Sequence, residues 1–168
     1  PAWQYDPASG EYYLHLFSRK QPDLNWENPA VRQAVYAMMN WWVERGVDGF
    51  RMDVINLISK TLPLADGVAN PLDGLCYDLG VVVNGPRLEE FLKEMNAAVG
   101  ISAKALFTVG EMLMVDVQHA RRYTSAKADE LGMVFTFEHM NLDQQPGFSR
   151  FDLRPLHLPD LKANLALW

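Results

Sequence analysis

From residue 28 onward, apolar positions alternate between helical spacing and short continuous runs. Apolar residues three and four positions apart predict helices over 28–46, 86–100, 116–123 and 156–168. Short apolar runs between these helices predict strands over 49–53, 106–109 and 133–137. The stretch 61–85 is rich in glycine and proline and is expected to form a long loop. The order is therefore helix and strand in strict alternation.

Such alternation is typical of an α/β fold whose parallel strands are joined by right-handed crossovers. Two architectures satisfy it: an open doubly wound sheet and a closed eight-stranded barrel. Three strands cannot close a barrel, and a complete one takes about 250 residues, whereas the chain has 168. The barrel interpretation makes the chain a segment of a longer protein. We expect both ends to be cut, because there is no initiator Met and Trp168 falls within the last predicted helix.

The first 19 residues differ from the rest of the chain because they are rich in aromatic side chains. A turn is expected over 6–10 and a short strand over 12–17. Aromatic rings can stack on sugar rings, and they can also pack a hairpin against a neighbouring element. The second interpretation is the simpler one.

Composition and charge narrow the function classes. Of the residues, 49% are hydrophobic or aromatic, which is enough for the core of one domain. Fifteen basic and twenty-one acidic side chains give a formal charge of −6, which argues against a nucleic-acid partner. No apolar run is long enough for a membrane helix, and no secretory signal is visible. Cys76 is the single cysteine, so an internal disulfide is excluded. We expect a soluble, cytoplasmic protein.

Candidate catalytic groups lie at the ends of two predicted strands. Asp53 and Glu111 each follow an apolar strand, and active sites of parallel α/β folds lie at the carboxyl ends of strands. Arg51 shares a strand face with Asp53 and is expected to keep that carboxylate ionised. Gly110 permits a close approach of backbone or ligand beside Glu111. Retaining glycoside hydrolysis uses two carboxylates about 5 Å apart. The alternative is a strand-end ion pair and a solvated Glu.

Four segments carry a more specific resemblance. Residues 46–56, Gly-Val-Asp-Gly-Phe-Arg-Met-Asp-Val-Ile-Asn, closely resemble the fourth-strand motif of the α-amylase superfamily, glycoside hydrolase family thirteen. Residues 108–112, Thr-Val-Gly-Glu-Met, resemble its fifth-strand motif. Residues 21–29 are similar to the segment that leads from the inserted B domain into the third barrel helix. Residues 137–143 resemble the sixth-strand region of oligo-1,6-glucosidases.

This resemblance implies an incomplete (β/α)8 TIM barrel that runs from about the third helix to the sixth helix. Residues 1–27 would form the C-terminal part of the B domain and the return to the barrel. Residues 28–168 would form the central part of the catalytic barrel. The family's third-strand motif and its third carboxylate, after the seventh strand, have no counterpart in the sequence. We therefore expect the isolated chain to have little or no hydrolase activity.

The resemblance also implies site roles. It makes Asp53 the nucleophile that forms a β-glucosyl ester and Glu111 the acid/base, with Arg51 bracing the nucleophile. Phe17 and Gln21 would line the glucose pocket, and the partner would be an oligosaccharide substrate. No cofactor or metal ligand is implied by these residues, and a calcium site in the longer protein cannot be inferred from them.

In the superfamily that the chain resembles, the residue after the nucleophile tracks linkage preference. Within the superfamily, Val is typical of enzymes that act on α-1,6 bonds and Thr of those that prefer α-1,4 bonds; here the residue is Val54. Phosphotrehalases also carry Val there and share the Asn-Leu-Ile-Ser-Lys continuation at 56–60. They tend to have His in place of Glu138, which favours an oligo-1,6-glucosidase.

Two further function classes fit the sequence less well. A phosphoryl-transfer enzyme with an aspartate nucleophile commonly has a second Asp two residues on, where this chain has Ile55. A non-catalytic relative that uses the barrel as an interaction surface usually loses the carboxylates, and both are present. The sequence does not give the oligomeric state.

Overall fold

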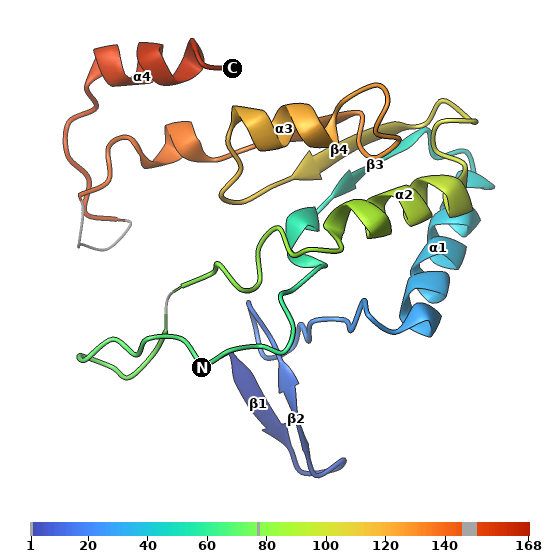
Figure 1. The fold of residues 1–168 in the computed structure, drawn as a ribbon, viewed down its shortest axis with the longest axis horizontal. Coiled ribbons are helices and arrows are strands. Elements are labelled where there is room, and N and C mark those ends of the chain that lie inside the picture. Colours follow the sequence, from blue (N-terminus) through green and yellow to red (C-terminus); the bar gives the residue numbers. More distant parts are fainter. Residues whose placement is uncertain (1, 77, 146–150) are drawn as a thin grey trace.

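Eleven short elements make up the computed structural model, which describes residues 2–76, 78–145 and 151–168 (Figure 1). The α-helices are α1 (Pro29–Val43), α2 (Leu88–Val99), α3 (Val117–Tyr123) and α4 (Leu158–Leu165), and two 3₁₀ turns are η1 (Ile55–Leu57) and η2 (Glu138–Asn141). The strands are β1 (Trp3–Asp6), β2 (Glu11–Leu14), β3 (Gly49–Met52), β4 (Phe107–Glu111) and β5 (Met133–Phe135). The predicted alternation of helices and strands is confirmed.

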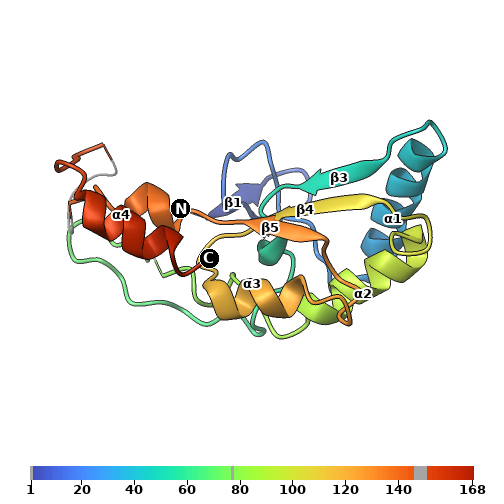
Figure 2. The same cartoon turned by 90° about the horizontal axis from the view of Figure 1, so that it is seen from above.

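The central feature is a three-stranded parallel sheet in the order β3-β4-β5. Helices α2 and α3 lie along one side of this sheet (Figure 2). Residues paired across parallel strands share a face, so the register Arg51↔Val109 and Glu111↔Phe135 puts all four side chains on one face. That face is the less buried one: Phe107, on the same face, is 54% exposed.

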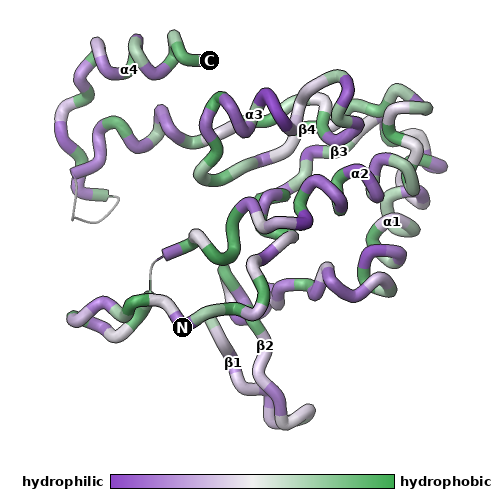
Figure 3. Tube along the Cα trace, in the orientation of Figure 1, coloured by the Kyte–Doolittle hydropathy of each residue, from purple (hydrophilic) through white to green (hydrophobic). Residues whose placement is uncertain are grey.

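The opposite face of the sheet packs on the helices. Met52 from β3 joins Phe91 and Leu92 of α2 and Tyr123 of α3 in one buried cluster. Both helices are amphipathic, as the alternating colours along their tubes show (Figure 3). Gly110 lies on this packed face, where an added Cβ would approach Leu131 Cδ1 to 2.8 Å. Its predicted close approach is therefore to core side chains and not to a ligand.

Helix ends follow the local rules. Asn28 caps α1 as predicted, because its side chain accepts a hydrogen bond from the Ala30 N–H at 2.9 Å. Gly100 ends α2 in the left-handed conformation, φ 74°. The segment 61–85 contains no helix or strand among its described residues, as expected. No helix in the described ranges combines the length and apolar character needed to cross a membrane.

Several predicted element boundaries were wrong. Helix α1 ends at Val43 rather than at residue 46, β4 covers Phe107–Glu111 rather than 106–109, and α4 covers Leu158–Leu165 rather than 156–168. The strand predicted over 12–17 is β2, which ends at Leu14 because its partner β1 begins at Trp3. The strand predicted over 133–137 ends at Phe135, where the partner β4 also ends. The strand predicted over 49–53 ends at Met52, because the chain turns immediately after Asp53. For β2 and β5, pairing with the neighbouring strand set the limit, and for β3 the turn at Val54 did.

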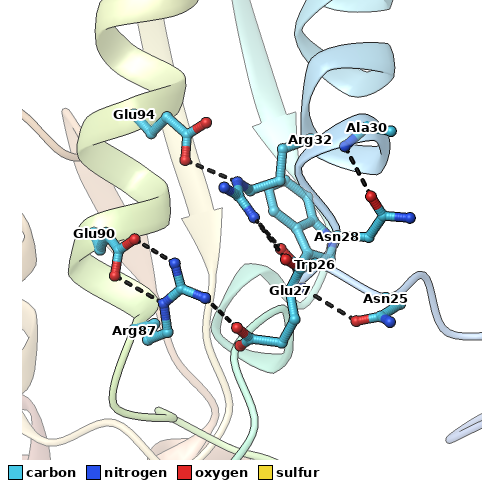
Figure 4. Close-up of polar contacts among 9 residues, drawn as sticks. All are labelled: Asn25, Trp26, Glu27, Asn28, Ala30, Arg32, Arg87, Glu90 and Glu94. Atoms are coloured by element: carbon cyan, nitrogen blue, oxygen red, sulfur yellow. Dashed lines mark hydrogen bonds and ion pairs between the residues drawn. The ribbon is translucent and has the colours of Figure 1, made fainter.

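The N-terminal hairpin of β1 and β2 projects away from the three-stranded sheet (Figure 1). The chain returns from it through residues 25–28, which a polar cluster fixes between α1 and α2 (Figure 4). Arg32 Nε binds Glu94 Oε2 at 2.8 Å, and Arg32 Nη1 donates to the carbonyl of Trp26 at 2.7 Å. Arg87, just before α2, pairs with Glu27 and Glu90. The return of the chain is thereby tied to both helices.

Replacing Arg32 with Met is expected to destabilise this junction. The Arg32 side chain is 10% exposed, and its loss leaves the Trp26 carbonyl and Glu94 without their donor. We expect the free energy of unfolding to fall by about 2 kcal/mol. Urea unfolding measures the change, with exposed Arg121→Met on α3 as the matched control. Equal midpoints for the two variants would contradict the anchoring role.

Candidate active site

Two carboxylates are joined by one guanidinium at the carboxyl ends of β3 and β4. Arg51 Nη1 donates to Asp53 Oδ1, and Arg51 Nη2 donates to Glu111 Oε2. The ion pair expected between Arg51 and Asp53 is present. The contact with Glu111 was not anticipated, because it depends on β3 and β4 being neighbours in register. Asp53 and Glu111 therefore lie on the same edge and the same face of the sheet.

The three side chains differ in exposure. Glu111 is 13% exposed, Arg51 is 50% exposed and Asp53 is 73% exposed. The third strand, β5, also contacts these side chains through Phe135, since the Arg51 Cζ atom lies 5.6 Å from the centre of the Phe135 ring. A cation over an aromatic face limits where the guanidinium can lie. All three strands of the sheet thus help to position the carboxylates.

The residue after Asp53 turns the chain away from the sheet. Val54 has φ 38° and ψ 43°, the left-handed conformation that a β-branched residue rarely adopts. Such a conformation costs about 1–3 kcal/mol and persists only where the surroundings impose it. The Val54 side chain packs against an apolar cluster that contains Leu57, Val82 and Val83. This turn leaves Asp53 at the tip of its strand.

Phe17 and Gln21 lie on the exposed loop between β2 and α1. No hydrogen bond or ion pair recorded for the described residues joins their side chains to Asp53 or Glu111. Their loop is nevertheless fixed to the segment behind Asp53. Asp23 Oδ2 accepts from the Leu16 N–H at 2.9 Å, and Asp23 Oδ1 lies 3.1 Å from Lys60 Nζ.

The structural role of residues 56–60 was not predicted from the sequence, where they indicate only a similarity between families. Asn56 and Ser59 are fully buried, and Lys60 is 13% exposed on its side chain. Ser59 Oγ accepts from the Arg87 N–H at 3.0 Å, which holds the start of α2. The signal available in the sequence was a short run after the strand in which polar residues are interspersed with apolar ones, because a polar group that is buried with its apolar neighbours requires a partner.

At the edge that carries the carboxylates, the Arg51 and Asp53 side chains are exposed to solvent. A cavity of about 320 Å³ lies instead at the amino ends of β4 and β5, and neither Asp53 nor Glu111 lines it. Across residues 2–76, 78–145 and 151–168, no three His, Cys, Asp or Glu side chains are grouped as a metal site. The chemistry that the edge can offer is that of two carboxylates and one guanidinium.

Comparison with known proteins decides the family. The alpha amylase catalytic domain family matches residues 1–168, the whole chain. The chain belongs to this family. It spans about 29% of the length of the curated relatives it matches.

Among relatives of this alpha-amylase family member, the oligo-1,6-glucosidase of Parageobacillus thermoglucosidasius is 54% identical over 169 residues. The oligo-1,6-glucosidase of Halalkalibacterium halodurans is 53% identical over the same number. Each alignment covers 99% of this chain and 29% of the relative. A solved structure of Bacillus licheniformis trehalose-6-phosphate hydrolase matches with a TM-score of 0.89 and 43% identity, covering 99% of this chain and 29% of that one.

Proposed function

We propose that the chain is part of a retaining glycoside hydrolase that cleaves α-glucosidic bonds, with Asp53 as nucleophile and Glu111 as acid/base. The observation that carries the proposal is the guanidinium of Arg51 bound to both carboxylates at adjacent strand ends. A double displacement needs two carboxyl groups that flank the glycosidic bond that is cleaved. Relatives named oligo-1,6-glucosidase and alpha-glucosidase support the same reaction class.

The chain occupies a defined part of this enzyme in our proposal. Residues 28–168 form the central part of a (β/α)8 barrel, from the third helix to the sixth. Residues 1–27 form the end of an inserted B domain and the return to the barrel. Parallel neighbours β3, β4 and β5 support the barrel segment, and the separate β1–β2 hairpin supports the division at residue 27.

The reaction follows from the two carboxylates. Glu111 gives a proton to the glycosidic oxygen while an Asp53 oxygen attacks the anomeric carbon, so the glucosyl–oxygen bond breaks and a β-glucosyl ester forms. Glu111 then takes a proton from water, which attacks the same carbon and frees Asp53. Arg51 orients the Asp53 carboxylate for attack. Two inversions give net retention, and no cofactor takes part.

We assign the substrate as short isomalto-oligosaccharides with α-1,6 bonds, with Phe17 and Gln21 lining the glucose pocket. Val54 carries the linkage assignment, because it directly follows Asp53 and presents an apolar branch rather than a hydroxyl. The oligosaccharide is the expected partner, with no nucleic acid or membrane involved, and we place the enzyme in the cytoplasm. An α-1,4-preferring α-glucosidase remains an alternative.

A second candidate is phosphotrehalase activity. The trehalose-6-phosphate hydrolase of Bacillus licheniformis matches this chain along 99% of its length, at 43% identity. Glu138 favours the oligo-1,6-glucosidase assignment, because phosphotrehalases tend to have His at this position. Its side chain accepts from Trp168 Nε1 at 3.0 Å and so ties the start of η2 to the residues that follow α4.

A substrate panel tests the assignment. The assay uses the full-length enzyme that carries this segment, or a chimera in which residues 1–168 replace the matching part of a curated oligo-1,6-glucosidase. We expect kcat/KM to be highest for isomaltose, against maltose, sucrose and trehalose 6-phosphate. Val54→Thr, which keeps the branch and the backbone strain, is expected to lower the isomaltose-to-maltose ratio by about tenfold.

A wild-type preference for maltose, or a ratio that Val54→Thr leaves unchanged, would contradict the role given to Val54. A preference for trehalose 6-phosphate would select the second candidate. Ile58→Val, a substitution of similar size four residues further along the chain, is the control and is expected to leave the ratio at its wild-type value.

A further inference from the structure

Asn56 occupies an unusual position behind the two carboxylates. It lies in η1, three residues after Asp53, and its side chain is fully buried. Its Nδ2 donates to the Leu113 carbonyl at 2.6 Å, and its Oδ1 accepts from the Leu113 N–H at 3.1 Å. Leu113 comes two residues after Glu111. One amide side chain therefore joins the segment after the proposed nucleophile to the segment after the proposed acid/base.

These two bonds take the place of a missing strand partner. Pairing of β3 with β4 ends at Met52↔Gly110, because the left-handed Val54 turns β3 away. The opposite edge of β4 continues to pair, since the Met112 N–H donates to the Phe135 carbonyl at 3.1 Å. On the β3 edge, the Asn56 amide satisfies both backbone groups of Leu113, as a neighbouring strand would.

Asn84 reinforces the link from the other side. Asn56 Nδ2 also donates to Asn84 Oδ1 at 3.0 Å, and the Asn84 N–H donates to the Asn56 carbonyl at 2.9 Å. Tyr123 Oη lies 3.4 Å from Asn84 Oδ1. Burial raises the pKa of Tyr123, so its hydroxyl stays protonated and can donate. The network holds the Asn56 amide in one orientation, in which Nδ2 donates to the Leu113 carbonyl and to Asn84 Oδ1.

We infer that Asn56 is a positioning residue that sets the separation of Asp53 and Glu111. This inference rests on the proposed function. An error of about 1 Å in the position of a catalytic group can cost about 10²-fold in rate. Protonation of the leaving group depends on where Glu111 lies. Loss of the hydrogen bonds between Asn56 and Leu113 is therefore expected to lower the rate most for substrates whose leaving group must be protonated. A residue that only stabilised the fold would not produce this dependence.

The test is Asn56→Ala in the full-length enzyme, assayed on isomaltose and on 2,4-dinitrophenyl α-glucoside, whose leaving group needs no protonation. We expect kcat/KM to fall about 10²-fold on isomaltose and tenfold or less on the aryl glucoside. Asn96→Ala is the matched control: Asn96 is buried and its amide also bridges a loop, to the Ser102 N–H and hydroxyl, at the other end of the sheet. It is expected to leave both kcat/KM values near wild type.

Asn56→Asp provides a second test, which still applies if the Asn56→Ala variant does not fold. It preserves side-chain volume, and only its protonated form can donate to the Leu113 carbonyl. We expect its kcat/KM on isomaltose, relative to wild type, to be higher at pH 5 than at pH 8. Equal losses on both substrates together with a flat pH ratio would overturn the inference. Failure of wild type to hydrolyse either α-glucoside would instead count against the proposed function.

Discussion

Asp53→Asn in the full-length enzyme is expected to lower kcat on isomaltose by about 10⁴-fold or more. The amide has the shape of the carboxylate but is a poor nucleophile, so the glucosyl ester does not form. Arg51 and Glu111 stay in place, because the amide oxygen can still accept from the Arg51 guanidinium. KM is expected to change little, since Asp53 acts in the transition state more than in substrate binding.

Release of glucose, followed over long incubations, measures this loss. Asp48→Asn is the matched control, because it is the same substitution at an exposed residue just before β3, at the other end of the strand. We expect that control to keep wild-type kcat. An Asp53→Asn variant that hydrolyses isomaltose at the original rate would exclude a nucleophilic role for Asp53.

Glu111→Gln is expected to show a loss that depends on the leaving group. With isomaltose, which needs a proton on the departing oxygen, kcat/KM is expected to fall by about 10²–10⁴-fold. With 2,4-dinitrophenyl α-glucoside the first step proceeds without the acid, and kcat/KM is expected to stay within about tenfold of wild type. Water activation in the second step also needs Glu111, so the glucosyl ester is expected to accumulate.

Azide distinguishes this variant from a merely damaged enzyme. A small anionic nucleophile needs no general base, so azide is expected to speed turnover of Glu111→Gln and to give α-glucosyl azide. Glu44→Gln, an exposed residue at the end of α1, is the control and is expected to behave as wild type. Equal losses on both substrates with no response to azide would contradict the acid/base role.

The order of helices and strands could be predicted from periodicity because each element presents one apolar face to a shared core. Asp53 and Glu111 stood out as candidates because a carboxylate at the end of an apolar strand is conspicuous, and the roles proposed for them came from the resemblance to the α-amylase superfamily. The Asn28 cap could be predicted for a local reason, since its hydrogen bond spans two residues.

Two features of the site could not be predicted, because they depend on how neighbouring strands pair. The contact of Arg51 with Glu111 requires β3 to lie beside β4 with Arg51 level with Val109, and no local pattern encodes that alignment. The role of Asn56 requires Val54 to break the strand pairing, and a left-handed Val is not what its side chain prefers. Both features belong to the edge of the sheet that carries the two carboxylates, where tertiary contacts override local preference.

Trapping the glucosyl ester tests the central claim most directly. 5-Fluoro-α-glucosyl fluoride loses fluoride as a carboxylate oxygen bonds to its anomeric carbon, and the ring fluorine slows the hydrolysis of the product. Trypsin then cuts after Arg51 and Lys60, which isolates residues 52–60 with Asp53 as the one side-chain carboxylate. Mass spectrometry is expected to find the fluoroglucosyl adduct on this peptide. An adduct on another peptide, or β-glucose as the first anomer released from isomaltose, would contradict the account.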